Sequence, residues 1–343
     1  MNLPESPVVG VVGATGAVGR VMLDILHQRG FPASEVVAIA SARSAGTEVR
    51  FGDRSLTVKV LEPGAFDGID LVLLDTPDEV AAEWAPQAVQ AGAIVVDNSA
   101  AWRADPQVPL VVPEANPGAV DQHKGIIASP NCATIGVVVP VAALHKTYHL
   151  QRMIVSTYQA TSGAGRGGVE ELEEQTQKLV GEMPALAAGD VQGRAPKSDV
   201  FAESIAFNIL PAIGSVKPDG STSEELKMLT ESRKIMDLES LEVITTCVRV
   251  PSVVGHGASV HARFADRVDA QEAQGILKHA PGVKLVELPT AHTGAGSDPC
   301  YVGRVRKDPF DERALSFFTV SDNLRKGAAL NAVQIAELLL PGR

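Results

Sequence analysis

The sequence is poor in aromatic residues and in cysteine, and it contains no long apolar run. Phe, Trp and Tyr make up 4% of the 343 residues, so the core must be built mainly from Val, Ala, Leu and Ile. Three widely spaced cysteines form neither a disulfide framework nor a zinc site, so we expect no bound metal and a reducing compartment. No run is long enough to span a membrane, and Met1 to Ser6 lack the features of a signal peptide. Together these absences predict a cytoplasmic protein.

Positive charge is also scarce. The chain has 30 Lys and Arg residues and 41 Asp and Glu residues, so its formal net charge is −11. This balance argues against a nucleic-acid partner and against binding to an anionic membrane surface. An anionic substrate would therefore have to meet cations that are concentrated locally. The length of the chain predicts two domains.

The N-terminal region has the pattern of a dinucleotide-binding unit. An apolar strand at 8–12 runs into a turn with glycines at 13, 16 and 19, then into a helix at 20–29 and a strand at 36–40. Glycines there let a pyrophosphate approach the backbone N–H groups of the helix start. The spacing differs from the commoner Gly-x-Gly-x-x-Gly, and a glycine-rich turn without a ligand remains an alternative. Ser41, Arg43 and Ser44 follow the second strand where an acidic residue would favour NAD, so NADP is predicted.

The fold predicted is α/β, with a Rossmann-like doubly wound domain over residues 1–132 followed by an α+β domain with a mixed sheet over 133–322. The first domain continues through strands at 70–74, 93–97 and 125–128, a helix at 78–91 and a sheet-edge segment at 111–116. The second contains strands at 153–160, 242–250, 261–265 and 284–287, and helices at 170–180 and 223–236. A last helix, 323–340, is apolar on more than one face, so we expect it to return to the first domain.

Cys132 occupies the most informative position in the chain. It lies in the stretch Ser-Pro-Asn-Cys at 129–132, between a short apolar strand and an apolar helix expected over 137–148. A thiol near the first N–H groups of a helix should ionise more readily than a free one, and a thiolate attacks acyl carbon well. The alternative is a buried, inert cysteine.

A second stretch, 249–259, places His256 between two glycines and Arg249 near the end of a strand. Histidine is the usual general acid or base near neutral pH, and a planar guanidinium suits a carboxylate. Glu224 and Lys227 lie three residues apart on a helix and share a face, although this helix start also resembles a capping box on a solvated helix. The amide of Gln159 follows a strand and can orient a substrate.

Nearly the whole chain resembles the bacterial aspartate-semialdehyde dehydrogenase family. The resemblance is carried by the glycine turn at 13–19, Ser-Pro-Asn-Cys at 129–132, Gln-Ala-Thr-Ser-Gly-Ala-Gly at 159–165, Glu-Glu-Leu-Lys-Met at 224–228 and the segment 249–256. It implies NADPH-dependent conversion of L-4-aspartyl phosphate to L-aspartate 4-semialdehyde with release of phosphate. The resemblance implies Cys132 as nucleophile, His256 as acid/base and Gln159 for orientation of the substrate. It implies that Arg249 binds the substrate carboxylate, that Glu224 binds its amino group, and that phosphate is bound by Arg103, Asn131 and Lys227. The residues implied for NADP are Gly13, Thr15, Gly16, Ala17, Val18, Ser41, Arg43, Ser44, Ser162, Gly163 and Asn323.

Two other interpretations stay open. N-acetyl-glutamyl-phosphate reductase is another acyl-phosphate reductase of this fold, but its substrate has no free amino group for Glu224 to bind. A non-catalytic binding relative would be signalled by loss of the cysteine, and Cys132 is present. The acidic helix 170–180 and the apolar segment 201–213, together with the resemblance, predict a homodimer built through the second domain.

Overall fold

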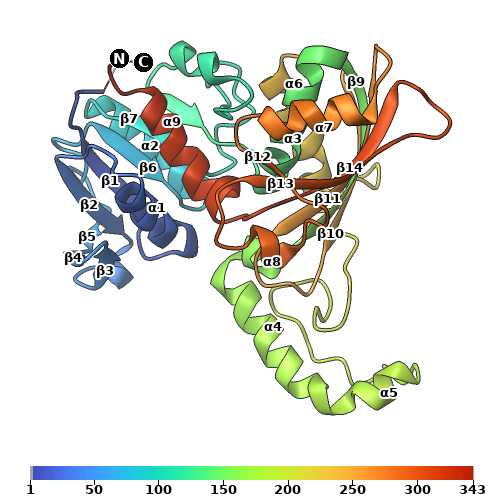
Figure 1. Ribbon diagram of the computed structural model, residues 1–343. Coiled ribbons are helices and arrows are strands. Elements are labelled where there is room, and N and C mark those ends of the chain that lie inside the picture. The colour runs from blue at the N-terminus through green and yellow to red at the C-terminus, as the bar shows by residue number, and fades with distance from the viewer. Residues whose placement is uncertain (1–2, 343) are drawn as a thin grey trace.

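The structure is a computed structural model that describes residues 3–342, and it contains two six-stranded sheets side by side (Figure 1). The first sheet is parallel throughout, in the order β5-β2-β1-β6-β7-β8. Its strands are β1 (Val8–Val12), β2 (Glu35–Ala40), β5 (Lys59–Val60), β6 (Leu71–Leu74), β7 (Ile94–Asp97) and β8 (Ile126–Ala128). The strand order reverses between β1 and β6, and ligands of such sheets bind where that reversal occurs.

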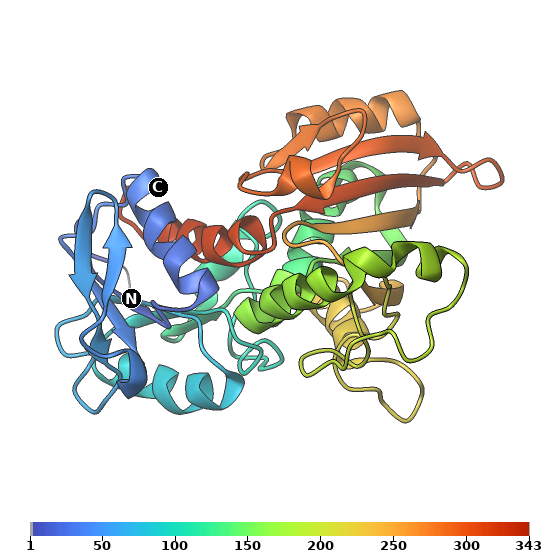
Figure 2. The same cartoon turned by 90° about the horizontal axis from the view of Figure 1, so that it is seen from below.

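Helices cover both faces of this sheet, namely α1 (Ala17–Gln28), α2 (Asp78–Gln90) and α9 (Leu330–Leu338). Figure 2 shows the C-terminal helix α9 lying beside α1, and its apolar residues belong to the core cluster of the first sheet. The chain end thus packs on the first sheet through α9, and a π-helical turn, Arg325–Ala329, precedes that helix. A small hairpin of β3 (Glu48–Phe51) and β4 (Arg54–Thr57) packs at the edge.

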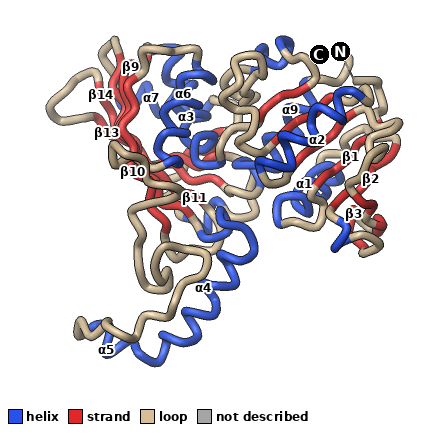
Figure 3. Tube along the Cα trace, turned by 180° about the vertical axis from the view of Figure 1, so that it is seen from behind, coloured by secondary structure: helices blue, strands red, loops and turns tan. Residues whose placement is uncertain are grey.

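The second sheet is mixed, in the order β10-β9-β11-β14-β13-β12. Its strands are β9 (Leu150–Gln159), β10 (Glu242–Arg249), β11 (His256–Phe264), β12 (Val283–Leu285), β13 (Cys300–Lys307) and β14 (Ala314–Ser321). Three helices pack on it, namely α3 (Cys132–Tyr148), α6 (Ser223–Met236) and α7 (Ala270–His279), with the short α8 (Ala291–Gly294) near β14. The two sheets are separate in the view from behind (Figure 3).

An arm projects from the second domain. It consists of α4 (Gly165–Leu179), α5 (Met183–Ala187) and the returning loop, and it extends away from both sheets (Figure 1). Gln175 fixes the loop to α4, because its side-chain oxygen accepts the backbone N–H groups of Ile205 and Ala206. The arm thus has a small apolar core of its own, which includes Leu172 and Leu179 of α4 and Leu210 of the returning loop.

Several local predictions were wrong. The segment 111–116 is no strand: it lies along the edge strand β8 only at its start, where the Val111 N–H donates to the Ala128 carbonyl, and it then forms a turn at 113–115. Helix α3 begins at Cys132 instead of 137, because Asn131 caps it. Strands β13 and β14 were missed, and Cys300 is fully buried at the start of β13.

Over residues 3–342, every helix is too short or too polar to cross a bilayer. In the same range, His, Cys, Asp and Glu side chains form no group of three or more arranged to hold a metal ion.

Candidate active site

A cleft of about 500 Å³ lies between the two sheets, at the carboxyl ends of the strands of the first. The sequence-predicted residues that line it are Gly16, Ala17, Val18, Arg103, Asn131, Cys132, Ser162, Gly163, Lys227 and Asn323. Residues more than three hundred positions apart, such as Gly16 and Asn323, therefore meet in one cavity. Gln159, Glu224, Arg249 and His256 are buried beside this cleft and reach it through hydrogen bonds or through contacts with its lining.

The glycine turn closes one end of the cleft. Gly13 has φ +85°, and a Cβ on it would lie 2.0 Å from the carbonyl oxygen of Asp75, so a side chain there is excluded. Gly16 is the N-cap of α1, which leaves the first N–H groups of a twelve-residue helix facing the cavity. The Asp75 carboxyl lines the same end, and burial raises its pKa to about 6. This end of the cleft has the shape and dipole that suit a pyrophosphate.

The predicted NADP-selecting residues lie just outside this cavity. Ser41 and Arg43 are exposed on a short 3₁₀ turn after β2, and Ser44 is within 3.3 Å of the Thr15 hydroxyl. On the opposite side, the Asn323 amide donates to the Ser162 hydroxyl at 2.9 Å. The turn after β2 is thus adjacent to the glycine turn, and the guanidinium of Arg43 on this turn is accessible to a ligand.

Cys132 is the first residue of α3, and the Asn131 side chain caps the helix by accepting the N–H groups of Ala133 and Thr134. The sequence predicted a thiol that ionises easily, but the structure indicates otherwise. Burial, followed by the nearby carboxylate of Glu224, raises the pKa of Cys132 to about 11. Arg249, Arg103 and the Ala133 N–H lower it by less. The free protein therefore holds a neutral thiol near pH 7, because desolvation outweighs the helix terminus.

His256 begins β11 and is fixed in one tautomer. Its Nδ1 accepts the backbone N–H of Ala160 at 3.1 Å, so the ring proton resides on Nε2. Nε2 is buried without a hydrogen-bond partner among residues 3–342, and it faces Gly163. Burial and the charge of Arg249 move the His256 pKa well below its usual value. The ring is therefore neutral and presents a donor.

Arg249 and Gln159 end the neighbouring strands β10 and β9, where they are paired in register. Arg249 Nη1 donates to the Ala160 carbonyl at 2.7 Å, and the guanidinium lies 5.8 Å from the centre of the Phe201 ring. The Gln159 amide donates to Glu224 at 3.2 Å and is almost fully buried. The guanidinium of Arg249, the amide of Gln159 and the carboxylate of Glu224 thus lie together on the side of Cys132 that faces the second sheet.

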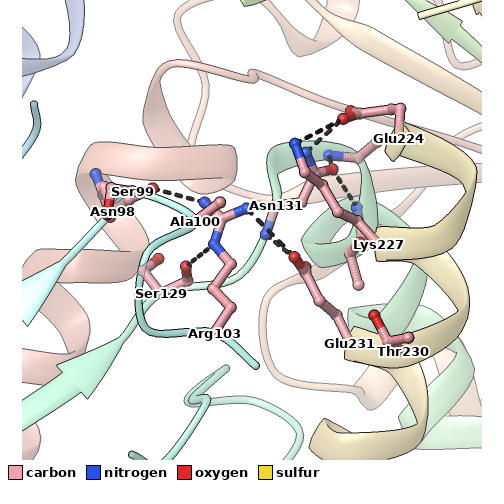
Figure 4. Close-up of polar contacts among 12 residues, drawn as sticks. Asn98, Ser99, Ala100, Arg103, Ser129, Asn131, Glu224, Lys227, Thr230 and Glu231 are labelled. Atoms are coloured by element: carbon pink, nitrogen blue, oxygen red, sulfur yellow. Dashed lines mark hydrogen bonds and ion pairs between the residues drawn. The ribbon is translucent and has the colours of Figure 1, made fainter. Parts of the chain in front are cut away.

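The cations Arg103 and Lys227 lie on either side of Asn131 (Figure 4). Arg103 Nε donates to the Ser129 carbonyl at 2.9 Å and its Nη2 to the Asn98 carbonyl at 2.6 Å. Lys227 Nζ is 3.2 Å from Glu224, whose other oxygen accepts the Asn131 amide at 2.9 Å. The helix cap is Thr222 with Glu225, so Glu224 and Lys227 are not part of a capping box.

Two buried charged residues near Cys132 were not predicted from the sequence. Glu231 lies seven residues after Glu224 on α6, a spacing that places both on one helix face and could have revealed it. Lys326 is in the π-helical turn and contacts Glu114 at 2.6 Å. The next residue, Gly327, is so close to Cys132 that a Cβ would lie 2.9 Å from the cysteine Cβ.

Comparison with known proteins is consistent along the whole chain. Two family models match, "Semialdehyde dehydrogenase, NAD binding domain" over residues 8–123 and "Semialdehyde dehydrogenase, dimerisation domain" over residues 141–326. Aspartate-semialdehyde dehydrogenase of Streptomyces akiyoshiensis is 47% identical to this chain, and the match covers 96% of this chain and 98% of that protein. Aspartate-semialdehyde dehydrogenase of Bacillus subtilis (strain 168) is 43% identical to this chain, and the match covers 96% of each. A crystal structure of aspartate semialdehyde dehydrogenase II from Vibrio cholerae complexed with ASA has a TM-score of 0.92 at 39% identity, with 98% of both chains covered.

Proposed function

The chain belongs to the semialdehyde dehydrogenase family, and from this membership we propose that it is an aspartate-semialdehyde dehydrogenase. It reduces L-4-aspartyl phosphate to L-aspartate 4-semialdehyde with NADPH and releases phosphate. This step serves the synthesis of lysine through diaminopimelate and of threonine, methionine and isoleucine. The observation that carries the proposal is a cysteine at a helix start, in one cleft with a dinucleotide-type glycine turn and two cations.

Cys132 is the nucleophile. Its sulfur attacks the acyl carbon, the bond from that carbon to the phosphate oxygen breaks, and the thiol proton leaves with the phosphate. A thioester on Cys132 and free phosphate result. NADPH, when bound, supplies the hydride that reduces the acyl group to the aldehyde. The sulfur leaves as a thiolate and regains a proton from solvent through His256, the proposed acid/base, whose Nε2–H donates a hydrogen bond into the cleft.

The remaining residues bind and orient the substrate. Arg249 takes the α-carboxylate and Glu224 the amino group, and Gln159, bonded to Glu224, orients the acyl group. Phosphate is bound by Arg103, Lys227 and the Asn131 amide. These groups lie around residues 129–132, called here the nucleophile turn (Figure 4). A substrate that is anionic at both ends thus meets local cations in a protein whose net charge is −11.

The first domain is an NAD(P)-binding domain, and we assign it a preference for NADP. Gly13, Gly16, Ala17 and Val18 would hold the pyrophosphate, and Ser162, Gly163 and Asn323 the nicotinamide half. Arg43, with Ser41, Ser44 and Thr15, would bind the 2′-phosphate. The support is an exposed guanidinium beside the glycine turn, at a position where an acidic residue would favour NAD.

A cytoplasmic homodimer is the proposed assembly, with NADP binding in residues 1–132 and 323–343 and catalysis and dimerisation in 133–322. One face of the second sheet packs on α3, α6 and α7. The other face exposes Ile154, Tyr158 and Ile244, which alternate with buried or half-buried positions on β9 and with half-buried positions on β10. An apolar sheet face of this kind suits a second copy of the chain, as the dimerisation-domain match supports.

The test is the reverse reaction, in which NADP is reduced in the presence of L-aspartate 4-semialdehyde and phosphate. Phosphate-dependent turnover is expected with this aldehyde and little with N-acetylglutamate semialdehyde, because Glu224 requires an amino group. Cys132→Ser should lower the rate by several orders of magnitude, and Cys300→Ala should not. Equal use of both aldehydes would favour another acyl-phosphate reductase, and near-native turnover by Cys132→Ser would refute the thioester route.

A further inference from the structure

Both cations of the candidate phosphate pocket are already paired with carboxylates from α6. Lys227 pairs with Glu224, and Arg103 Nη1 lies 3.3 Å from Oε1 of Glu231 (Figure 4). Four charged side chains therefore converge on the nucleophile turn with a formal sum of zero. The proposed function assigns a role to three of them and leaves Glu231 without one.

Glu231 is tied to the nucleophile turn as well as to Arg103. Its second oxygen accepts the backbone N–H of Asn131 at 2.7 Å, one residue before Cys132. The side chain is 4% exposed. Burial raises the pKa of Glu231, while Arg103 and the Asn131 N–H oppose that shift. Both of its oxygens accept hydrogen bonds, one from Arg103 and one from the Asn131 N–H, which is the bonding pattern of a carboxylate. Burying a carboxylate beside an anion pocket is costly, and packing alone does not require it.

The position of this carboxylate has two physical consequences. It fixes Arg103 and the Asn131 backbone to one anchor, which preorganises the pocket before an anion enters. It also repels any anion bound by Arg103, because the two negative charges share one guanidinium in a poorly solvated site. A pocket with two unopposed cations would bind the phosphate product more tightly and release it more slowly.

We propose that Glu231 is the built-in counter-charge of the phosphate pocket, positioning Arg103 and the nucleophile turn while weakening the hold on phosphate so that it can leave. The inference rests on the proposed function, since it takes phosphate as the anion of this pocket. Glu231 is a positioning residue in this scheme, because it acts through Arg103 and the Asn131 backbone.

The test compares Glu231→Gln with Glu225→Gln in the full-length protein. Glutamine keeps an oxygen for the Asn131 N–H and removes the charge. Glu225 is on the same helix and likewise accepts backbone N–H groups, those of Thr222 and Cys247, but it does not contact Arg103. Inorganic phosphate is titrated by calorimetry, and the steady-state constants for phosphate are measured with saturating aldehyde and NADP.

Glu231→Gln should bind phosphate about 5- to 20-fold more tightly, as expected for removing one like charge close to the anion. Its KM for phosphate should fall while kcat stays equal or decreases, and Glu225→Gln should match the wild type. If Glu231→Gln does not fold, Glu231→Asp retracts the charge by one methylene and should tighten phosphate in the same direction, by about 2-fold or more. Unchanged or weaker binding in the folded variant would overturn the proposal. Failure of the wild type to bind or use phosphate would instead refute the proposed function.

Discussion

The backbone N–H of Ala160 donates to Nδ1 of His256 at 3.1 Å and thereby fixes the proton of the ring on Nε2. This nitrogen faces the cleft near Gly163, while the thiol of Cys132 is protonated in the free protein. The neutral histidine therefore presents a hydrogen-bond donor to the cleft, and it has no free nitrogen to remove the proton of the thiol. The proposed nucleophile and the proposed acid/base thus have separable roles.

Replacing the histidine should expose that separation. His256→Ala should lower turnover by about 10²–10⁴-fold, the usual effect of losing a proton-transfer group. Alkylation of Cys132 by iodoacetamide should continue, because the thiol does not depend on this ring for ionisation. Peptide mass spectrometry measures the labelling. A variant that no longer labels at Cys132, with an unchanged unfolding temperature, would contradict the division of roles.

The reactivity of Cys132 should depend steeply on pH. Its pKa of about 11 lies above the usual thiol value, so the reactive thiolate fraction rises as pH increases. We expect the alkylation rate to rise about tenfold for each pH unit between about pH 7 and pH 9. Cys247 and Cys300, both fully buried with pKa values raised to about 12, serve as internal controls and should label far more slowly. A plateau in the Cys132 rate below pH 8 would indicate a thiolate at neutral pH.

A single methyl group at Gly163 should disturb two site residues together. A Cβ there would lie 2.8 Å from Arg249 Nη1 and 3.0 Å from His256 Nε2. Gly163→Ala should therefore lower kcat/KM by about 10²-fold, because small displacements of such groups are costly to catalysis. Gly167→Ala is the matched control, since the nearest atom to its Cβ is 3.6 Å away. Equal activity of the two variants would show that the site tolerates the shift.

Cofactor selection should depend on Arg43. Arg43→Ala should raise KM for NADP by about 10-fold or more, as expected for losing a charge-assisted hydrogen bond to phosphate, and leave KM for NAD nearly unchanged. Arg50→Ala, an exposed arginine on β3 that bonds the Gly52 carbonyl, is the control. Initial rates measured with each cofactor give the KM values for NADP and for NAD. An equal loss with NADP and NAD would refute the assignment.

Dimerisation should depend on the apolar face of the second sheet. The double variant Ile154→Asp, Ile244→Asp introduces charge at two positions that are 44% and 51% exposed in the single chain, and it should be monomeric. Ala82→Asp adds the same charge on the exposed side of α2 and should remain dimeric. Static light scattering at micromolar concentration distinguishes these states. A monomeric wild type would contradict the proposed assembly.

The local elements of this fold could be predicted from the sequence because their signals lie within a few neighbouring residues. The glycine turn between β1 and α1, with its φ of +85° at Gly13, requires residues without a side chain. Helix α6 has the predicted bounds, Ser223–Met236, since a cap and a charged, amphipathic pattern mark its ends. The position of Cys132 at a strand-to-helix turn could be recognised in the same way, although the Asn131 cap moved the helix start forward to the cysteine.

The chemical state of the site was decided by the tertiary structure. The helix start alone predicts an easily ionised thiol, but burial and Glu224, from an element far along the chain, raise the pKa of Cys132 to about 11. Glu231 meets the Asn131 backbone across 100 residues of sequence, so no local pattern reveals their contact. Desolvation and charge pairing depend on which distant residues are brought together. The sequence therefore determined which groups the site contains, and folding determined their protonation and their partners.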